Sequence, residues 1–250
     1  MINRAAILLG LFCALFAGAG PALAAPAETV LYTFNTQVDG LAPIGSLVPD
    51  GAGGFYIATD AGGSASCAGL NATLGCGAIV KLSPPKAAGA GWTETVLHSF
   101  SGTDGTGPLD LVADSVGNLY TPTQSGSRGQ CYNGSGCGTF VELSPPAAGT
   151  SRWTETVLYR PGNGWTGPGN VIADRKGNLY ATMKRGGAFY RGAVVKLSPP
   201  AAAKSSWTQT VLFSFKGGAD GSQPAALIWG RAGSLYLTTA VGGATGRGAG

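Results

Sequence analysis

Four near-copies of one short segment constrain this chain more than any other feature. The segment WTETVL at Trp92–Leu97 returns at Trp153–Leu158 and, as WTQTVL, at Trp207–Leu212, so successive units are 61 and 54 residues long. An earlier echo lies at Glu28–Tyr32. Tandem units of roughly this length are typical of propeller blades. The repetition predicts an architecture of similar modules packed side by side.

Each repeat has the sequence pattern of four short strands. In the second copy, Leu109–Asp114 and Leu119–Thr121 flank a polar turn that contains glycine, as in a β-hairpin. After a variable loop, Thr139–Leu143 is a third strand that two prolines end, and Trp153–Tyr159, rich in Thr and Val, is a fourth. A four-stranded sheet cannot bury both of its faces alone. We therefore predict an all-β fold, a β-propeller of four-stranded antiparallel blades, with a parallel β-helix as the second architecture considered.

The hairpin turn between the first two strands carries a recurring glycine. Gly117, Gly177 and Gly233 hold the same position in successive copies, where we expect a backbone with positive φ. Asp114 and Asp174 lie three residues before this glycine, and their carboxylates can accept hydrogen bonds from the amides of the turn. These acids are therefore expected to be turn residues.

Three complete blades are predicted at Leu47–Phe100, Leu109–Arg160 and Asn170–Phe215. A fourth begins at Ala225 and has no counterpart of the third strand before Gly250. The sequence allows two interpretations: a fragment of a larger propeller, or an open four-bladed ring. In either case, the β-propeller repeat domain is expected to span residues 25–250, incomplete at its C-terminus.

The first 24 residues are predicted to be a secretory signal peptide. Arg4 precedes an apolar run, Ala5–Phe16, that is too short to span a bilayer, and Ala22–Ala24 offers small residues for cleavage. An uncleaved anchor is the alternative. We expect cleavage near Ala24, no transmembrane segment in the mature chain, and a secreted, periplasmic or cell-surface location.

Four cysteines remain after the signal peptide, and they follow the length of one loop. Cys67 and Cys76 lie in a long loop of the first copy, and Cys131 and Cys137 lie in the matching loop of the second. The third copy has a short loop there, Gly186–Gly192, and no cysteine. Covalent closure of a long loop persists in an oxidising compartment. We predict the disulfides Cys67–Cys76 and Cys131–Cys137; a four-cysteine metal site would need the two loops to touch and would have no histidine ligand.

The charged residues give no sign of a nucleic-acid partner. The chain has 16 Lys and Arg against 12 Asp and Glu, a net charge of +4, and its basic residues are dispersed. Nucleic-acid binding would call for a dense basic patch or stripe. Lys184 and Arg185, together with Arg191, are a local concentration that favours an anionic polymer. We expect a monomer without a cofactor or a metal ion.

Residues suited to catalysis occupy repeated positions. The single histidine, His98, stands where other copies have Tyr32, Tyr159 and Phe213, which indicates a packing residue rather than the base of a Ser-His-Asp triad. Acidic residues recur before glycine or at the hairpin turn, whereas one active site needs its acids only once. These acids are Asp39, Asp104 and Asp220, and then Asp50, Asp114 and Asp174. The sequence therefore predicts no enzyme and no catalytic residues; a secreted carboxylate-dependent hydrolase or lyase acting on polysaccharide is the alternative.

Several motifs together resemble a known family. They are Thr95–Phe100, Asp104-Gly105 with Pro108, Gly117–Tyr120, Gly126 and Val141–Pro145. The chain resembles the choice-of-anchor tandem repeat GloVer-containing proteins, which are bacterial exported proteins. The resemblance implies a secreted or surface-tethered repeat protein of propeller type with no established activity. The printed residues depart from this pattern in two ways: they include no sorting anchor, which leaves the mode of tethering open, and the third copy loses the Phe and Asp of the pattern, which is expected to put Trp165 in a loop.

The longest and most variable loops are predicted to project from one edge of the blades. They are Gly63–Gly77, Gly126–Gly138 and Gly186–Gly192, and they join the same pair of strands in each copy. Variable loops on a rigid scaffold often bind ligands. The candidate contact residues are Leu70, Tyr132, Trp165, Phe189 and Tyr190. We predict an exported, non-enzymatic binding or scaffold module for an unidentified polymer or protein; loops that merely cap the rim, and a purely structural protein, are the alternatives.

Overall fold

The computed structural model describes residues 29–34, 40–63, 67, 74–126, 136–202 and 206–243. The chain divides into two units, residues 1–30 and 31–250, and every strand belongs to the second unit. The described residues form β-strands and two short 3₁₀ turns, with no α-helix. None of their helices is long and apolar enough to cross a bilayer. The predicted signal peptide lies outside the described residues.

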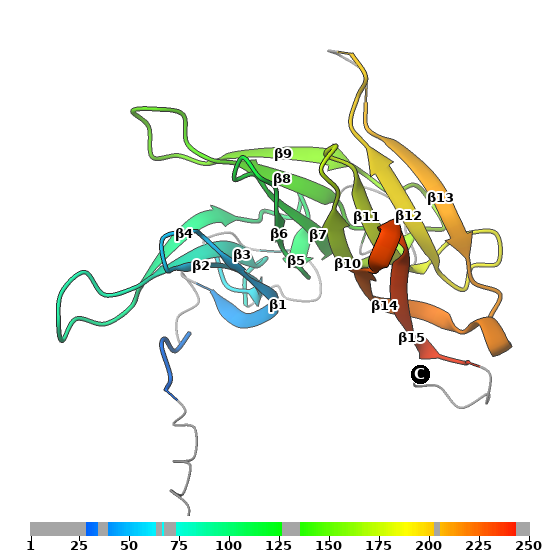
Figure 1. Ribbon diagram of the computed structural model, residues 1–250, viewed down its shortest axis with the longest axis horizontal. Coiled ribbons are helices and arrows are strands. Elements are labelled where there is room, and N and C mark those ends of the chain that lie inside the picture. The colour runs from blue at the N-terminus through cyan, green and yellow to red at the C-terminus, as the bar shows by residue number, and fades with distance from the viewer. Residues whose placement is uncertain are drawn as a thin grey trace, which may run out of the picture. The chain divides into compact units, whose positions relative to one another are not determined.

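The strands pair in chain order into four antiparallel sheets, which we name blades 1 to 4 (Figure 1). Blade 1 consists of β1 (Leu41–Pro49), β2 (Phe55–Ala61), β3 (Ala78–Ser83) and β4 (Thr93–Ser99). Blade 2 consists of β5 (Thr106–Pro108), β6 (Val112–Ala113), β7 (Leu119–Ser125), β8 (Phe140–Ser144) and β9 (Thr154–Tyr159). Blade 3 consists of β10 (Thr166–Ala173), β11 (Leu179–Arg185), β12 (Ala193–Ser198) and β13 (Thr208–Ser214). In blade 4 the described strands are β14 (Ser222–Trp229) and β15 (Leu235–Val241), and the all-β propeller-type fold class is confirmed.

The first strand of every blade begins earlier than predicted, because the alternation of its side chains between the two faces of the sheet is interrupted. A left-handed residue precedes a proline in each of these strands: Ala42 (φ 54°), Gly107 (φ 60°), Gly167 (φ 61°) and Gln223 (φ 53°). The pairing register shifts just after the proline in β1, β10 and β14, and the first strand of blade 2 is split there into β5 and β6. A bulge of this kind breaks the period of two on which the sequence-based strand limits rest.

Hydrophobic cores lie between neighbouring sheets. Phe100, which follows the last strand of blade 1, is fully buried in a cluster with Leu119, Val141 and Leu143 of blade 2. Phe215, which follows the last strand of blade 3, is buried with Leu227 of blade 4. Blades 2 and 3 share a third cluster. Each sheet therefore buries a face that it cannot bury by itself, and each phenylalanine removed from water stabilises the fold by roughly 1.5–3 kcal/mol.

A chain of hydrogen bonds connects the first strands of the blades. The buried Asp110 accepts hydrogen bonds from the Ser46 amide of blade 1 (3.1 Å) and, in blade 3, from Asn170 Nδ2 (2.5 Å) and the Val171 amide (3.2 Å). Asn170 Oδ1 accepts the amide hydrogen of Leu227 in blade 4 (2.8 Å). We name Asp110 and Asn170 the inter-blade ladder. A buried carboxyl group that accepts several hydrogen bonds fixes the relative positions of the strands that donate them.

The ladder predicts a large stability cost for Asp110→Ala. This change leaves three donors, one on β1 and two on β10, without their acceptor, so we expect the free energy of unfolding to fall by about 2–4 kcal/mol. Urea denaturation followed by tryptophan fluorescence measures it. Asp220→Ala, which removes an exposed carboxylate from the 3₁₀ turn Gly218–Asp220, is the control and is expected to change stability by less than about 0.5 kcal/mol. Equal effects of the two changes would contradict the ladder.

The hairpin turns agree with the sequence prediction. Gly117, Gly177 and Gly233 all have positive φ, between 77° and 93°. Asp114 Oδ1 accepts hydrogen bonds from the amides of Val116 and Asn118, both at 2.9 Å. Asp174 does the same for the amides of Lys176 and Asn178, and Asp50 for those of Ala52 and Gly54. These recurring acids therefore serve as turn residues.

The predicted disulfide between Cys67 and Cys76 is confirmed. Its Cα atoms are 5.3 Å apart, and both residues are buried in the core between blades 1 and 2. Cys131, the predicted partner of the buried Cys137, lies outside the described residues. The first bridge therefore closes the long β2–β3 loop from inside the protein.

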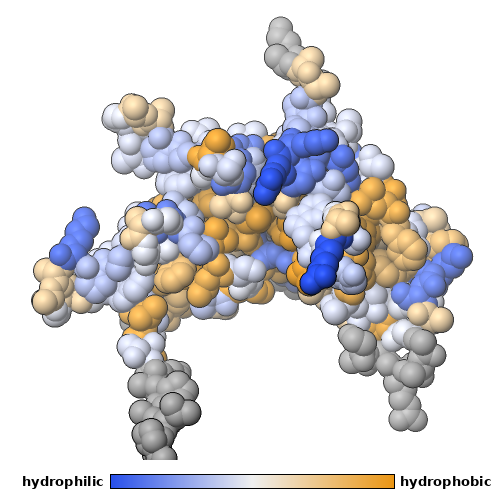
Figure 2. All heavy atoms as spheres, in the orientation of Figure 1, coloured by the Kyte–Doolittle hydropathy of each residue, from blue (hydrophilic) through white to orange (hydrophobic). Residues whose placement is uncertain are grey.

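Blades 3 and 4 expose hydrophobic surface, which Figure 2 shows in the region that these two sheets occupy in Figure 1. Tyr236 on β15 is 60% exposed, whereas Tyr120, its counterpart in blade 2, is 6% exposed. Large apolar residues are also exposed on β13 and β14: Val211, Leu212, Phe213, Ile228 and Trp229. In the described chain, a repeat position whose side chain is buried in blade 2 is thus exposed in blade 4.

Candidate functional site

The loops that join the second and third strands all leave the same end of their blades, which we name the loop end. Pairs of glycines close these loops at the base: the Gly77 amide donates to Gly62 O (2.9 Å), and the Gly192 amide donates to Gly186 O (3.3 Å). The β11–β12 loop, residues 186–192, is described throughout. Leu70 and Tyr132, predicted contact residues of the other two loops, lie outside the described residues.

Blade 3 differs from the other blades at the start of its first strand. Blade 2 has Gly105 there, which lies directly against the loop glycine Gly126, and blades 1 and 4 have similar glycine pairs. In blade 3, Trp165 takes this place, and its ring lies so close to Gly186 that a Cβ there would be 2.3 Å from it. Trp165 is half-buried and packs against the core shared by blades 2 and 3. The Trp165 ring therefore packs directly against Gly186, at the base of the β11–β12 loop.

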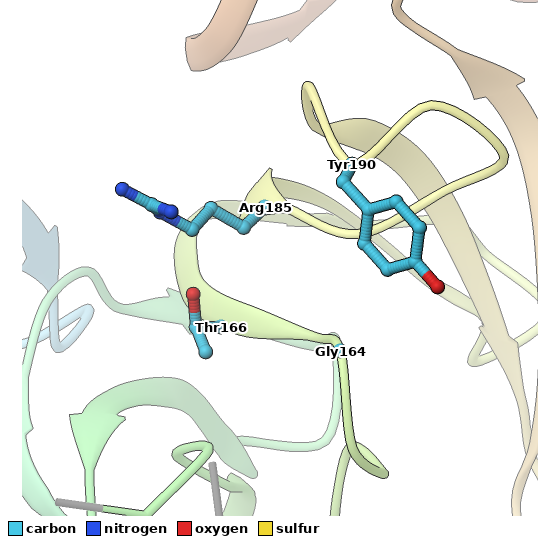
Figure 3. A pocket seen from close by; sticks show the side chains of 4 residues that line it. All are labelled: Gly164, Thr166, Arg185 and Tyr190. Atoms are coloured by element: carbon cyan, nitrogen blue, oxygen red, sulfur yellow. The ribbon is translucent and has the colours of Figure 1, made fainter. Parts of the chain in front are cut away.

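A pocket of about 340 Å³ lies beside this tryptophan (Figure 3). It is lined by Gly164, by Thr166 on β10, by Arg185 at the end of β11, and by Tyr190 in the β11–β12 loop. Thr166 and Arg185 are paired across the two strands. In the view of Figure 3, Arg185 and Tyr190 lie on opposite sides of the pocket. The pocket thus combines a guanidinium group, a hydroxyl group and an aromatic ring.

Backbone hydrogen bonds hold the loop that presents the tyrosine. The Ala188 amide donates to Ser214 Oγ (3.2 Å), and Arg191 O accepts from the Gln223 amide of blade 4 (2.9 Å). Tyr190 has a left-handed backbone (φ 55°), which is strained for a residue with a side chain, and it is 71% exposed. Strain of this kind persists where the surroundings impose it, often at functional sites. These hydrogen bonds tie the loop backbone on both sides of Tyr190 to β13 and to blade 4.

The sequence-predicted contact residues are partly brought together here. Phe189, 48% exposed, and Tyr190 share the loop, and Lys216 Nζ lies 5.8 Å from the centre of the Phe189 ring. Thr166 and Lys216 were not among the predicted contact residues, and Arg185 was not predicted to line a pocket. The register of β10 against β11 places Thr166 opposite Arg185, and the repeat pattern of the sequence does not reveal this pairing.

A second polar cluster lies between blades 1 and 2. His98 Nε2 and Asp104 Oδ2 are 2.7 Å apart, and the His98 ring packs edge-on against Phe100 at 4.8 Å. The sequence predicted a packing role for His98 but not its contact with Asp104. A groove of about 690 Å³ runs beside it, lined by residues 96–99 and 152–155. Ser101 Oγ donates to Asp104 Oδ1 (2.8 Å) and not to His98, so these residues lack the serine-to-histidine contact of a catalytic triad.

Two carboxyl groups, Glu155 in the groove and Asp104 beside His98, have opposite pKa shifts. Burial raises the pKa of Asp104, but hydrogen bonds from His98 and Ser101 outweigh burial and hold it below its ordinary value. Burial raises the pKa of Glu155, the charge of Asp104 raises it further, and His98 and Arg160 oppose the shift. Within the described chain, Glu155 Oε1 is buried without a hydrogen-bond partner. Gln209, uncharged, holds the same repeat position in blade 3.

Because the pKa of Glu155 is raised in the folded protein, we expect Glu155→Gln to stabilise the protein only at pH values at which Glu155 is ionised. The cost of the carboxylate is absent below the unfolded-state pKa and grows as the pH rises through the higher folded-state pKa. Because the side chain is partly exposed and screened, we expect a gain of about 0.5 kcal/mol at pH 7 and none at pH 4. Thermal unfolding at the two pH values measures this, and an equal gain at both would contradict the charge-based explanation.

The fold and these sites define an all-β repeat protein of propeller type with a pocket at the loop end of one blade. The sequence matches the family model described as the Gloeobacter/Verrucomicrobia repeat over residues 22–249. The chain belongs to this family, which confirms the resemblance drawn from its motifs. No curated protein matches the sequence.

Solved structures with a similar course of the chain include three enzymes. A xylan β-1,4-xylosidase from Bacillus halodurans C-125 shares 13% identity (TM-score 0.43; 80% of this chain, 38% of that chain). An ulvan lyase bound to -[GlcA(1-4)Rha3S]- shares 14% (TM-score 0.44; 85% and 51%). A gluconolactonase from Xanthomonas campestris shares 12% (TM-score 0.40; 83% and 73%). The chain spans about half or less of the first two proteins, and likeness at this level carries nothing about activity.

Proposed function

We propose that this protein is an exported, non-enzymatic recognition module that binds a polymer or protein ligand through the loop end of blade 3. The observation that carries the proposal is the exposed, backbone-strained Tyr190, held by a hydrogen-bonded loop beside Arg185 and Thr166. Export is supported by the predicted signal peptide, and both the repeat family and the buried Cys67–Cys76 bridge are consistent with it.

The construction of the pocket suits binding. A tyrosine supplies a large contact surface at a small cost in conformational entropy, and a loop already fixed in place needs no further ordering when a ligand binds. Pockets that bind small ligands or parts of polymers combine an apolar wall with a few polar groups, as Tyr190, Thr166 and Arg185 do here. Blade 3 alone has Trp165 in place of glycine beneath the loop, so the repeat architecture itself does not demand this pocket.

The placement of the acids supports a role other than catalysis for this pocket. No carboxyl group is among the described residues that line it. Asp114 and Asp174 accept hydrogen bonds within hairpin turns, and Asp110 accepts hydrogen bonds from blades 1 and 3. Glycoside hydrolysis by a pair of carboxyl groups needs both of them beside the substrate.

One observation favours a second candidate, a carboxylate-dependent hydrolase or lyase acting in the groove between blades 1 and 2. Glu155, which lines the groove, and Asp104, which contacts the lining residue His98, have pKa values shifted in opposite directions, as an acid and a base require. Asp104 is only 8% exposed, however, and its carboxyl group is occupied by His98 and Ser101. Blade 3 has the uncharged Gln209 at the repeat position of Glu155, which favours a structural rather than a catalytic role for Glu155.

Tyr190→Ala tests the proposed site. Purified protein is screened against arrays of glycans and against extracts of cell-envelope protein, and its affinity for the captured ligand is then measured. We expect Tyr190→Ala to weaken binding about tenfold, or about 1.4 kcal/mol. Tyr236→Ala, which truncates a similarly exposed tyrosine on blade 4, is the matched control and should leave the affinity within about twofold.

Two results would contradict this proposal. One is an equal loss of affinity in the two tyrosine variants, which would place the ligand elsewhere or make the effect non-specific. The other is turnover of a polysaccharide by the purified protein that Asp104→Asn or Glu155→Gln abolishes, which would establish the second candidate instead.

A further inference from the structure

The charge of this chain is divided unevenly along its sequence. Residues 25–162 carry 5 Lys and Arg against 10 Asp and Glu, whereas residues 163–250 carry 10 against 2. The net charge of +4 for the whole chain conceals this difference. Blades 3 and 4 are therefore strongly basic, and blades 1 and 2 are acidic.

Four of the basic residues belong to the loop end of blade 3. Lys184 and Arg185 end β11, Arg191 lies in the β11–β12 loop, and Lys216 follows β13. Two of them lie beside the exposed aromatic residues. Arg185 lines the pocket with Tyr190, and Lys216 Nζ is 5.8 Å from the centre of the Phe189 ring. A Cβ at Gly217, which follows Lys216, would lie 3.8 Å from Arg191 Cγ. We name Lys184, Arg185, Arg191 and Lys216 the cation group.

Residues 163–250 contain two acidic residues. Of the two acids in residues 163–250, Asp174 lies in the β10–β11 turn, at the opposite end of the strands, where it bonds the amides of that turn. Asp220 lies in the 3₁₀ turn before β14 and is exposed. The cation group therefore gives the loop end of blade 3 an excess of positive charge beside the Tyr190 pocket.

The pocket matches one ligand chemistry, a sugar ring that carries an anion. An aromatic ring offers its face to the apolar side of a sugar, and a guanidinium group offers paired donors to a carboxylate or a sulfate. Tyr190 and Arg185 lie on opposite sides of a pocket that is at the small end of the roughly 300–1,000 Å³ range of ligand sites. The Thr166 hydroxyl, paired across the strands with Arg185, can donate to or accept from a sugar hydroxyl.

We propose that the loop end of blade 3 binds an anionic polysaccharide, one whose sugars carry carboxylate or sulfate groups. This inference rests on the proposed binding function of the same site. The Tyr190 pocket takes a short stretch of the polymer, and Arg191 and Lys216 contact the charges of neighbouring sugars. A single-stranded nucleic acid would instead need a track of several stacking residues along a basic groove. Within the described β11–β12 loop, the exposed aromatic residues are the adjacent Phe189 and Tyr190.

The test compares polymers that differ in charge alone. Affinity electrophoresis and calorimetry are carried out with polygalacturonate and its fully methyl-esterified form, and with dextran sulfate and dextran. We expect at least about tenfold tighter binding of a charged polymer than of its neutral partner, with an affinity that falls as salt is added. Binding of polygalacturonate identifies the carboxylate as the recognised anion, and binding of dextran sulfate identifies the sulfate.

Charge-matched variants locate the effect. The double change Arg185→Gln and Arg191→Gln is expected to weaken binding of the charged polymer at least about tenfold. Arg175→Gln with Lys176→Gln removes the same charge from the β10–β11 turn and should leave the affinity within about twofold. Equal losses in the two double variants would overturn the site, because they would show attraction to net charge alone.

Further outcomes separate this inference from the proposed function. Neutral polymers that bind as tightly as charged ones, in a manner that depends on Tyr190, would overturn the anionic class and leave the binding function standing. A single-stranded oligothymidylate that binds as tightly as the charged polysaccharides, with the same dependence on Arg185, would overturn the sugar identity. If every probe that binds did so equally well in Tyr190→Ala, both the anionic-ligand inference and the proposed binding function of this site would be overturned.

Discussion

The structure depends on the burial of one sheet against the next. A four-stranded antiparallel sheet has two faces, and in this chain the apolar side chains of one blade are covered by those of its neighbour. Phe100 shows the arrangement most directly, because it follows the last strand of blade 1 and is fully buried among residues of blade 2. Asp110 and Asn170 add a polar constraint, since their hydrogen bonds connect first strands that the hydrophobic contacts alone would leave free to slide.

This division of roles explains where a binding site can arise. Residues repeated in every copy are occupied by turns, strand pairing and the cores between blades, so variation is tolerated mainly at the loop end. Blade 3 uses that freedom in two ways. Trp165 replaces a glycine and fills the space under the β11–β12 loop, and the loop above it presents Tyr190 in a strained backbone conformation. The basic residues of blades 3 and 4 then give this one pocket an electrostatic character that the other blades lack.

Much of the fold could be predicted because repetition exposes it. Gly117 and Asp114 recur at one turn, and the cysteine pair at residues 67 and 76 follows the length of its loop, so both were read correctly. The irregularity around each proline was not predicted, because alanine and glutamine, as at Ala42 and Gln223, rarely adopt a left-handed backbone. Asp110 was missed because only Asn170 resembles it among the copies. Phe189 and Tyr190 were identified from their loop, but Arg185 and Thr166 meet there through strand register, which the sequence does not display.

Native-state hydrogen exchange measured residue by residue tests most directly whether the blades form one cooperative body. The amides of Ser46, Val171 and Leu227 lie in three different blades and donate to the inter-blade ladder. The account predicts that these three amides exchange with one common opening free energy, among the largest in the protein, and that they lose protection together in Asp110→Ala. Exchange at three unrelated rates, each following its own blade, would contradict it.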